Sequence, residues 1–248
     1  MVASFAPKLV FIRFGELMIQ SIYDEMWERF ELASAHNDYE LDAHLLDIAS
    51  DTRRGITALA YLKQGNRSVL DEIMSFQKAV CEIEPNQYYH PLEELHLTVL
   101  SVISCVPEFE LSEINIHSYI EIFRSVLSSN QQIEIKYQGV SASPNCILLQ
   151  GFPVSDSLEQ FRNELRTQLS EAGLRVTFDS RYKLVTAHSS LIRFRVPISD
   201  SRQLFRLCQQ YRNYDFGSIV LKDFELVFNN WYQNLVVTKS LARGSLLD

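Results

Sequence analysis

From residue 54 onward, the first half of the chain alternates between continuous apolar runs and segments in which apolar residues recur every three to four positions. The runs at 55–62 and 95–104 have the length and composition of buried strands. Between them, a stripe with helical spacing predicts an amphipathic helix capped by Ser68, and its members are Val69, Ile73, Phe76 and Val80. A further helix is predicted over 112–127, so this half has the order strand, helix, strand, helix.

The second half repeats this order with different residues. A hairpin, a helix, a strand, a helix and two closing strands are predicted. One helix lies between Asp156 and Gly173, with the apolar stripe Leu158, Phe161, Leu165 and Leu169. Asp156 with Glu159 predicts a capping box at its start, and Gly173 predicts a C-terminal cap. The other predicted segments are 133–140, 146–152, 184–197, 200–211, 218–228 and 233–240.

Residues 1–53 precede this repeat and are predicted to form an N-terminal helical extension, separate from a main domain at 54–248. Within 15–50, apolar residues fall near helical spacing, namely Met18, Ile22, Trp27 and Phe30. No apolar run approaches the roughly 18 to 20 residues that a membrane span needs. The N-terminus also lacks the order of a signal peptide. We therefore expect a cytoplasmic protein with no membrane partner.

Charge is unevenly distributed along the chain. The net charge is −8, but residues 1–124 hold 9 basic and 20 acidic residues, whereas residues 125–248 hold 14 and 11. An acidic total argues against tracking along nucleic acids, which needs an extended basic face. The window 181–195 is the exception, because it holds four basic residues, no carboxylate and a central His188. It fits a site for a small phosphorylated ligand or a solvated charged edge.

The four cysteines predict neither a disulfide framework nor a metal site. They are widely spaced in apolar segments, at Cys81, Cys105, Cys146 and Cys208. No C-x-x-C pair and no Cys/His cluster with zinc spacing occurs. We expect reduced, buried thiols and no metal ligand set.

Two short motifs carry the candidate chemistry. His96 is followed two positions later by Thr98, and His188 is followed two positions later by Ser190, each inside a predicted strand. Side chains at i and i+2 of a strand share a face, so each pair offers an imidazole beside a hydroxyl. About one H-x-[ST] match is expected by chance, but these two occupy equivalent places in the duplicated strand and helix order. The pattern therefore predicts one bipartite site.

The two motifs resemble the paired H-x-[ST] signatures of the two-histidine phosphoesterases, a superfamily that includes 2′-5′ RNA ligase-like proteins and cyclic nucleotide phosphodiesterases. The resemblance covers about residues 54–240, and the segments at 84–89, 193–195 and 229–232 add to it. It implies an α+β fold of two pseudo-symmetric lobes, each with an antiparallel sheet and helices, facing each other across a central cleft. Each lobe would contribute one histidine.

The resemblance implies cleavage of a phosphodiester, a 2′,3′-cyclic phosphate or a 2′,5′ linkage in a nucleotide or at an RNA end, without metal or cofactor. The residues are suited to this chemistry. One of His96 and His188 can deprotonate the attacking group while the other protonates the leaving oxygen. Thr98 and Ser190 can bind the non-bridging oxygens and stabilise the charge that develops on them.

Three further residues are candidates for substrate binding. Tyr88 and Tyr89, in the loop before the first motif, can stack on a base, or they can pack on their own lobe. Strand parity places Arg193 on the face opposite His188, so Arg193 would contact phosphate only if a β-bulge reversed that parity. His90 on the same loop as the tyrosines is expected to be a surface or loop-packing residue.

Three alternative functions remain open from the sequence. The same chemistry run in reverse would make the chain a ligase or transferase acting on RNA ends. A non-catalytic nucleotide- or RNA-binding module would keep the cleft without turnover. An interaction protein would carry its function on residues 15–50 and use the lobes as a scaffold. The sequence predicts no oligomeric state.

Overall fold

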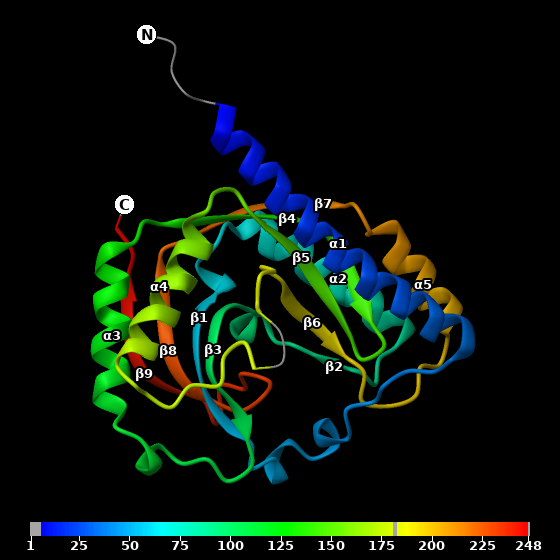
Figure 1. Cartoon of the computed structure of the whole chain (residues 1–248). Helices are drawn as coiled ribbons and strands as arrows, with labels where there is room; N and C mark the ends of the chain where they lie inside the picture. The colour runs from blue at the N-terminus through cyan, green and yellow to red at the C-terminus, as the bar shows by residue number, and fades with distance from the viewer. Residues whose placement is uncertain (1–5, 181–182, 248) are drawn as a thin grey trace.

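The structure is a computed structural model that describes residues 6–180 and 183–247, with side chains from residue 15 onward. Arg181 of the basic window lies outside the described residues. Two antiparallel sheets form the centre of the molecule (Figure 1). The first sheet has the order β3–β1–β8–β9, with bounds His96–Val106, Arg54–Tyr61, Asp223–Asn229 and Lys239–Ser245. The second has the order β2–β6–β5–β4–β7, with bounds Tyr88–Tyr89, Ser189–Arg193, Cys146–Pro153, Ile133–Ser143 and Asp215–Leu221.

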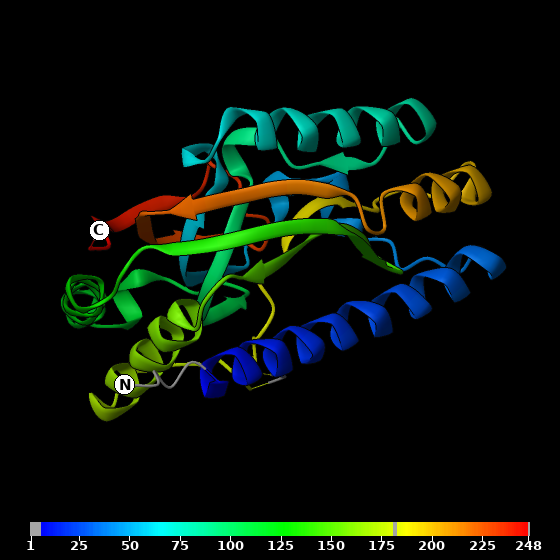
Figure 2. The same cartoon turned by 90° about the horizontal axis from the view of Figure 1, so that it is seen from above.

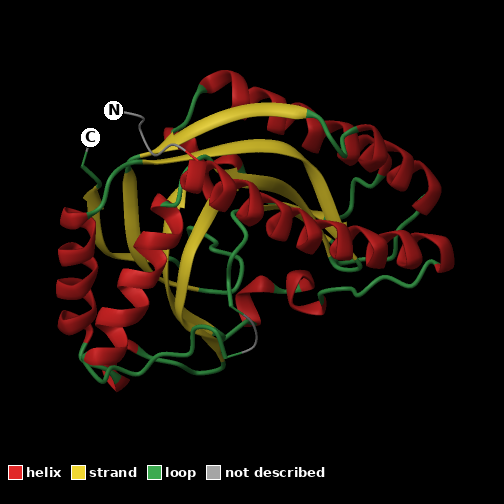
Figure 3. Ribbon diagram, turned by 45° about the horizontal axis from the view of Figure 1, so that its top comes forward, coloured by secondary structure: helices red, strands yellow, loops and turns green. Residues whose placement is uncertain are grey.

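Five α-helices of the described chain lie outside the sheets: α1 (Ala6–His36), α2 (Arg67–Ile83), α3 (Ile116–Ser129), α4 (Ser157–Glu171) and α5 (Ser201–Gln210). Helices α3 and α4 pack together, α3 against β9 and α4 against β3, and so belong to the first sheet. Helices α1, α2 and α5 pack against β4, β5 and β7 of the second sheet (Figure 2). The helices therefore enclose the two sheets, as Figure 3 shows by element type.

The two lobes are interleaved along the chain rather than formed from its successive halves. From the first half, β2 and α2 belong to the second sheet, whereas α4 from the second half packs on the first. The predicted strand 218–228 is wrong, because it is two strands, β7 and β8, in different sheets. The chain turns at Lys222, where the Gln64 side-chain oxygen accepts hydrogen bonds from the backbone N–H groups of Lys222 and Asp223. That acceptor lies 158 positions from Lys222 in sequence, so no local signal marks the turn.

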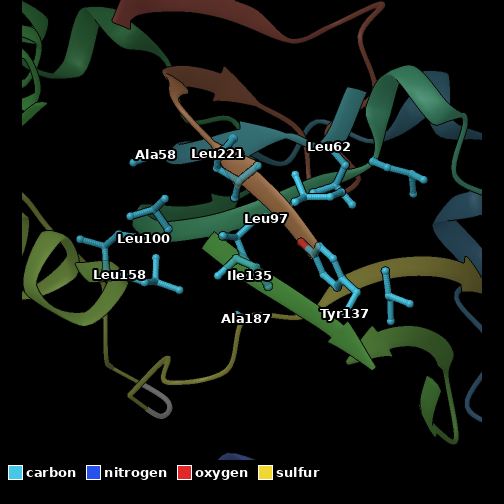
Figure 4. Close-up of a cluster of buried hydrophobic side chains, with 14 of the residues drawn as sticks. Ala58, Leu62, Leu97, Leu100, Ile135, Tyr137, Leu158, Ala187 and Leu221 are labelled. Atoms are coloured by element: carbon cyan, nitrogen blue, oxygen red, sulfur yellow. The ribbon is translucent and has the colours of Figure 1, made fainter. Parts of the chain in front are cut away.

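Side chains from both sheets pack into one apolar core. It includes the predicted stripes of α2 and α4, which are buried as expected. Figure 4 shows part of it, where Leu97 of β3 lies beside Ile135 of β4. Burying each large apolar side chain contributes about 1.5–3 kcal/mol. Because both sheets share this core, the positions of their opposing edges are coupled.

Helix ends follow the predictions only in part. The Gly173 C-terminal cap is confirmed, since Gly173 has φ +65° after the end of α4. The cap of α2 is Asn66 instead of Ser68, and its side-chain oxygen accepts from the Ser68 N–H at 3.0 Å. The capping box at the start of α4 is absent, because Asp156 makes no cap hydrogen bond. Its partner Glu159 instead pairs with Arg166 and Lys183.

The N-terminal segment is helical over α1 and continues through two short 3₁₀ turns, Ala43–Leu46 and Ile48–Ser50. Its buried side chains include Ile19, Tyr23 and Phe30, while Met18 of the predicted stripe is 47% exposed. The Tyr23 hydroxyl donates to the Gly151 carbonyl of β5 at 3.1 Å. Phe30 belongs to the main core. The inner face of α1 thus packs on the second sheet.

Candidate functional site

A cavity of about 340 Å³ opens between the two sheets. Its floor is the hydroxyl-rich face of β1 and β3, formed by Thr57, Thr98, Ser101 and Ser104. Residues of the second sheet and its flanking loops cover it, including His188, Ser190 and Arg193. The two predicted histidines and their hydroxyl partners therefore line one space. Its size lies within the usual range of small-molecule sites.

The cavity walls come from two segments on opposite sides of the floor. Residues 177–180 and Leu184 form one wall, and the Thr177 backbone N–H donates to the Val102 carbonyl on the free edge of β3 at 2.9 Å. The segment 229–233 leaves the end of β8, which lies on the far side of β1. It places Trp231 in the wall with 37% of its surface exposed. Sequence patterns did not assign these wall residues, because their approach depends on strand order.

His96 is the first residue of β3, and its ring is oriented by the residues just before the strand. Its Nδ1 lies 2.7 Å from the carbonyl oxygen of Glu94. A carbonyl can only accept a hydrogen bond, so Nδ1 carries the proton. The nitrogen left for a ligand is Nε2. Thr98, two residues on, shares the cavity face with His96, as strand parity predicts.

His188 directly precedes β6, and its predicted strand 184–197 is shorter than expected, since only Ser189–Arg193 is β-paired. Its Nδ1 lies 2.8 Å from the hydroxyl oxygen of Thr186, which again leaves Nε2 for a ligand. Gly151 of β5 permits this placement: a Cβ there would lie 2.0 Å from the Ala187 carbonyl oxygen. The chain before β6 can therefore pass close to β5.

The hydroxyl beside each histidine is available for a ligand. Among the described residues, the side-chain oxygens of Thr98 and Ser190 have no hydrogen-bond partner in the protein. Both groups can donate one hydrogen bond to an anion. The two motifs together present two imidazoles and two hydroxyl donors to the same space.

Electrostatics hold both imidazoles neutral at neutral pH. Burial lowers the pKa of His96 to about 4, with the Glu94 carbonyl opposing the shift and Arg193 adding to it. Burial also lowers the pKa of His188 to about 4, with Arg162, Arg193 and His96 acting in the same direction. A bound phosphate would favour the protonated forms, since an opposite charge nearby stabilises a cation.

Arg193 lines the cavity, against the parity argument that placed it on the opposite face. The register of β5 with β6 shifts between Ile147 and Leu148, which is a β-bulge that adds one residue to β6. The extra residue returns Arg193 to the face of His188 and Ser190. Arg195 does not reach the cavity, because its guanidinium donates to the Asn86 carbonyl at 2.8 Å. Arg193 is the one cation among the described lining residues.

Tyr88 and Tyr89 are not among the described residues that line the cavity. They form the short edge strand β2, which pairs with Ile192 and Arg193 of β6. The Tyr89 hydroxyl donates to the Glu84 carbonyl at 2.8 Å, and that of Tyr88 to the Glu94 carboxylate at 3.3 Å. Base stacking by these residues is therefore not supported, since both rings pack within the protein.

His90 lines the cavity, whereas the sequence predicted a surface or loop-packing residue. It is 3% exposed, and neither ring nitrogen has a hydrogen-bond partner within the described chain. The backbone N–H of His90 donates to the Leu191 carbonyl at 3.0 Å, which fixes this part of the chain beside β6. Burial, Arg193 and His96 lower its pKa well below the usual value. Only the β2–β6 pairing reveals this position.

Two kinds of feature are absent from residues 6–180 and 183–247. No group of three or more His, Cys, Asp or Glu side chains in these ranges is arranged to hold a metal ion. No helix there is long and apolar enough to cross a membrane. All four cysteines are free thiols.

The chain is a two-lobed α+β protein, with two antiparallel sheets and helices outside them. One cavity holds His96 from the start of β3 and His188 from just before β6. The same fold is found in TT0787 of Thermus thermophilus, with a TM-score of 0.54 and 16% identity over 78% of this chain and 97% of that chain. E. coli LigT complexed with 3′-AMP matches with a TM-score of 0.53 and 12% identity, over 79% of this chain and 99% of that one.

A third solved structure, of a protein described as a phosphoesterase, matches with a TM-score of 0.50 and 14% identity over 79% of this chain and 99% of that chain. No family model and no curated protein matches the sequence. At these identities the likeness establishes the fold. It confirms the two-lobed architecture that the resemblance to two-histidine phosphoesterases implied.

Proposed function

We propose that this chain is a two-histidine phosphoesterase that hydrolyses a phosphodiester of a nucleotide or an RNA end, of the 2′,3′-cyclic or 2′,5′-linked type. One observation carries the proposal: His96 at the start of β3 and His188 just before β6 line one cavity, each with a hydroxyl two residues on. A pair of imidazoles can act as acid and base in one step. The fold shared with LigT and with a phosphoesterase supports the same reaction class.

The two histidines differ in a way that favours one assignment of roles. His188 lies near Arg162 and Arg193, whose positive charges favour its neutral form, so it is the proposed base. The Glu94 carbonyl accepts from Nδ1 of His96 and stabilises an imidazolium, so His96 is the proposed acid. Water attacks phosphorus and gives its proton to Nε2 of His188. The bond from phosphorus to the leaving ribose oxygen breaks, and that oxygen takes the proton that protonated His96 carries on Nε2, while the proton on Nδ1 stays in the hydrogen bond to the Glu94 carbonyl.

The remaining cavity groups stabilise charge on the phosphate. Thr98 and Ser190 would donate hydrogen bonds to the non-bridging oxygens, and Arg193 would neutralise their charge. Donors aimed at a developing oxyanion contribute about 2.7–4 kcal/mol each in enzymes where one has been removed. The hydroxyls of the floor suit a ribose, and Trp231 in the wall suits a base, because every base has a face that can stack.

A substrate panel tests the proposal. Purified protein is assayed with 2′,3′-cyclic nucleotides, 2′,5′-linked dinucleotides and RNA carrying a cyclic phosphate end, and the products are separated by chromatography. We expect turnover of at least one substrate and a loss of about 10²–10⁴-fold in H96A and H188A. His117, exposed on α3, provides the matched control H117A, which should keep full activity. Joining of RNA ends without hydrolysis would instead favour the ligase alternative, and binding without turnover the non-catalytic module.

A further inference from the structure

Arg162 of α4 is a fully buried guanidinium, and it belongs to neither motif. It is 0% exposed and is among the largest completely buried side chains. Its Nε donates to the Val99 carbonyl at 2.8 Å, and its Nη2 donates to the Thr98 carbonyl at 3.0 Å and the Thr186 carbonyl at 2.8 Å. Its Nη1 has no partner within the described chain.

This cation has no carboxylate at ion-pair distance among the described residues. Two acidic groups near it, Glu159 and Asp179, pair instead with Arg166, one turn further along α4. Removing a charge from water without a counterion costs several kcal/mol. Three carbonyl acceptors offset part of that cost. An arginine kept in this environment needs a role that an apolar residue would not fill.

The three carbonyls identify what Arg162 connects. Thr98 and Val99 lie on the free edge of β3, and Thr98 is the hydroxyl residue of the first motif. Thr186 lies two residues before His188, and its hydroxyl contacts Nδ1 of that histidine. A single side chain therefore bridges the edge of the first sheet to the segment that orients the histidine of the second.

We propose that Arg162 is a positioning residue of the two-histidine site, which holds the two motifs at a set separation and places a fixed positive charge behind His188. The proposal rests on the proposed function. The groups whose charges act on His188 are Arg162 from α4, Arg193 from β6 and His96 from β3, and the titratable residues His90 and Asp179 line the same cavity. With Arg162 present, the imidazole of His188 stays neutral and ready to accept a proton.

Two variants separate the charge of Arg162 from its hydrogen bonds. R162Q removes the charge and retains one donor group, whereas R162K retains the charge and loses the planar fork. The matched control is R166Q, from the same helix, whose guanidinium pairs with Glu159 and Asp179 and touches neither motif residue. All three are compared with the parent chain by thermal unfolding and by the pH profile of kcat/KM.

The acidic limb of the pH profile of kcat/KM reports the ionisation of the base. We expect this limb to shift to higher pH by about 1 unit in R162Q, because loss of a nearby cation raises the pKa of His188. R162K should keep that limb and lose about 10–100-fold in kcat, since the motifs are less well held. R166Q should lower the melting temperature without moving the limb. An unmoved limb in R162Q with only a lower melting temperature would overturn the proposal.

An NMR titration of the His188 imidazole keeps this test independent of the reaction. If the parent chain cleaves no substrate in the panel, the proposed function fails, yet the His188 pKa can still be compared between the parent chain and R162Q. An upward shift supports the placement of the charge, and equal values contradict it. If R162Q does not fold, R162K still tests the positioning role: a loss of about 10–100-fold in kcat at the parent His188 pKa supports it, and an unchanged kcat contradicts it.

Discussion

The Nδ1–H group of His96 donates a hydrogen bond to the carbonyl oxygen of Glu94, at 2.7 Å. This contact sets the tautomer of His96 and stabilises its protonated form. At His188, the corresponding Nδ1 atom contacts the Thr186 hydroxyl instead of a carbonyl. The positive charges of Arg162 and Arg193 act on this imidazole. The duplicated motifs are therefore electrostatically unequal, which is what an acid and a base require.

The unequal roles predict a dependence on the leaving group. A substrate with a p-nitrophenol leaving group needs little help from a general acid, because that leaving group is a weak base. In H96A we therefore expect the rate loss to shrink from about 10²–10⁴-fold on a nucleotide to about 10-fold or less on bis-p-nitrophenyl phosphate. In H188A the loss should be large on both. Equal losses of the two variants on both substrates would contradict the assignment.

The lowered pKa values predict an acidic optimum. The base must be neutral and the acid protonated, so kcat/KM should follow a bell whose limbs report both groups. Burial lowers both pKa values to about 4 from the usual value near 6.5. We expect the optimum of kcat/KM below pH 6.5 and a fall of about tenfold per unit on the alkaline limb. Rates measured from about pH 3.5 to about pH 8 in buffers of constant ionic strength test this, and a maximum above about pH 7 would exclude it.

Trp231 predicts a base-binding contribution that is separable from the chemistry. Its ring lines the cavity wall and is 37% exposed, so replacement by alanine should leave the fold intact. Base stacking is worth about 1–3 kcal/mol, which corresponds to a rise in KM of about 5–150-fold for a nucleotide. The same variant should be unchanged on bis-p-nitrophenyl phosphate if that substrate is held only at the histidines. A loss in kcat on both substrates would show that Trp231 acts otherwise.

His90 predicts a loss of stability in acid. Its pKa in the folded chain is well below 6.5, so below that pH the unfolded chain binds a proton that the folded chain does not. Its contribution is fully present above pH 6.5 and declines as pH falls. We expect the free energy of unfolding in urea to drop less between about pH 7 and about pH 5 in H90F than in the parent chain. H117F, changed at an exposed position, is the control and should follow the parent. An identical pH dependence in H90F would contradict the burial of an uncharged His90.

Local patterns were sufficient for most helices and for the two motifs. The stripes of α2 and α4 repeat at about 3.6 residues, and burial of one face follows directly from that period. The same holds for His96 and Thr98, which share a face because neighbours at i and i+2 in a strand must do so. The two motifs occupy equivalent places in the duplicated order of strands and helices, and this order predicted that they form one bipartite site. The helix stripes and the individual motifs depend on residues a few positions apart.

Features that depend on residues far apart in the sequence could be identified only in the folded structure. The bulge in β6 that turns Arg193 into the cavity arises from its register with β5, and the turn at Lys222 is held by Gln64. His90 is buried by its pairing beside β6, and Arg162 reaches the carbonyl of Thr98 in β3 and that of Thr186 in the segment before β6. Periodicity and motif spacing are local properties, so they identified the residues that carry the proposed chemistry. Strand register and interleaving bring together residues that no sequence period relates, so the groups that surround those residues emerged only once the chain was folded.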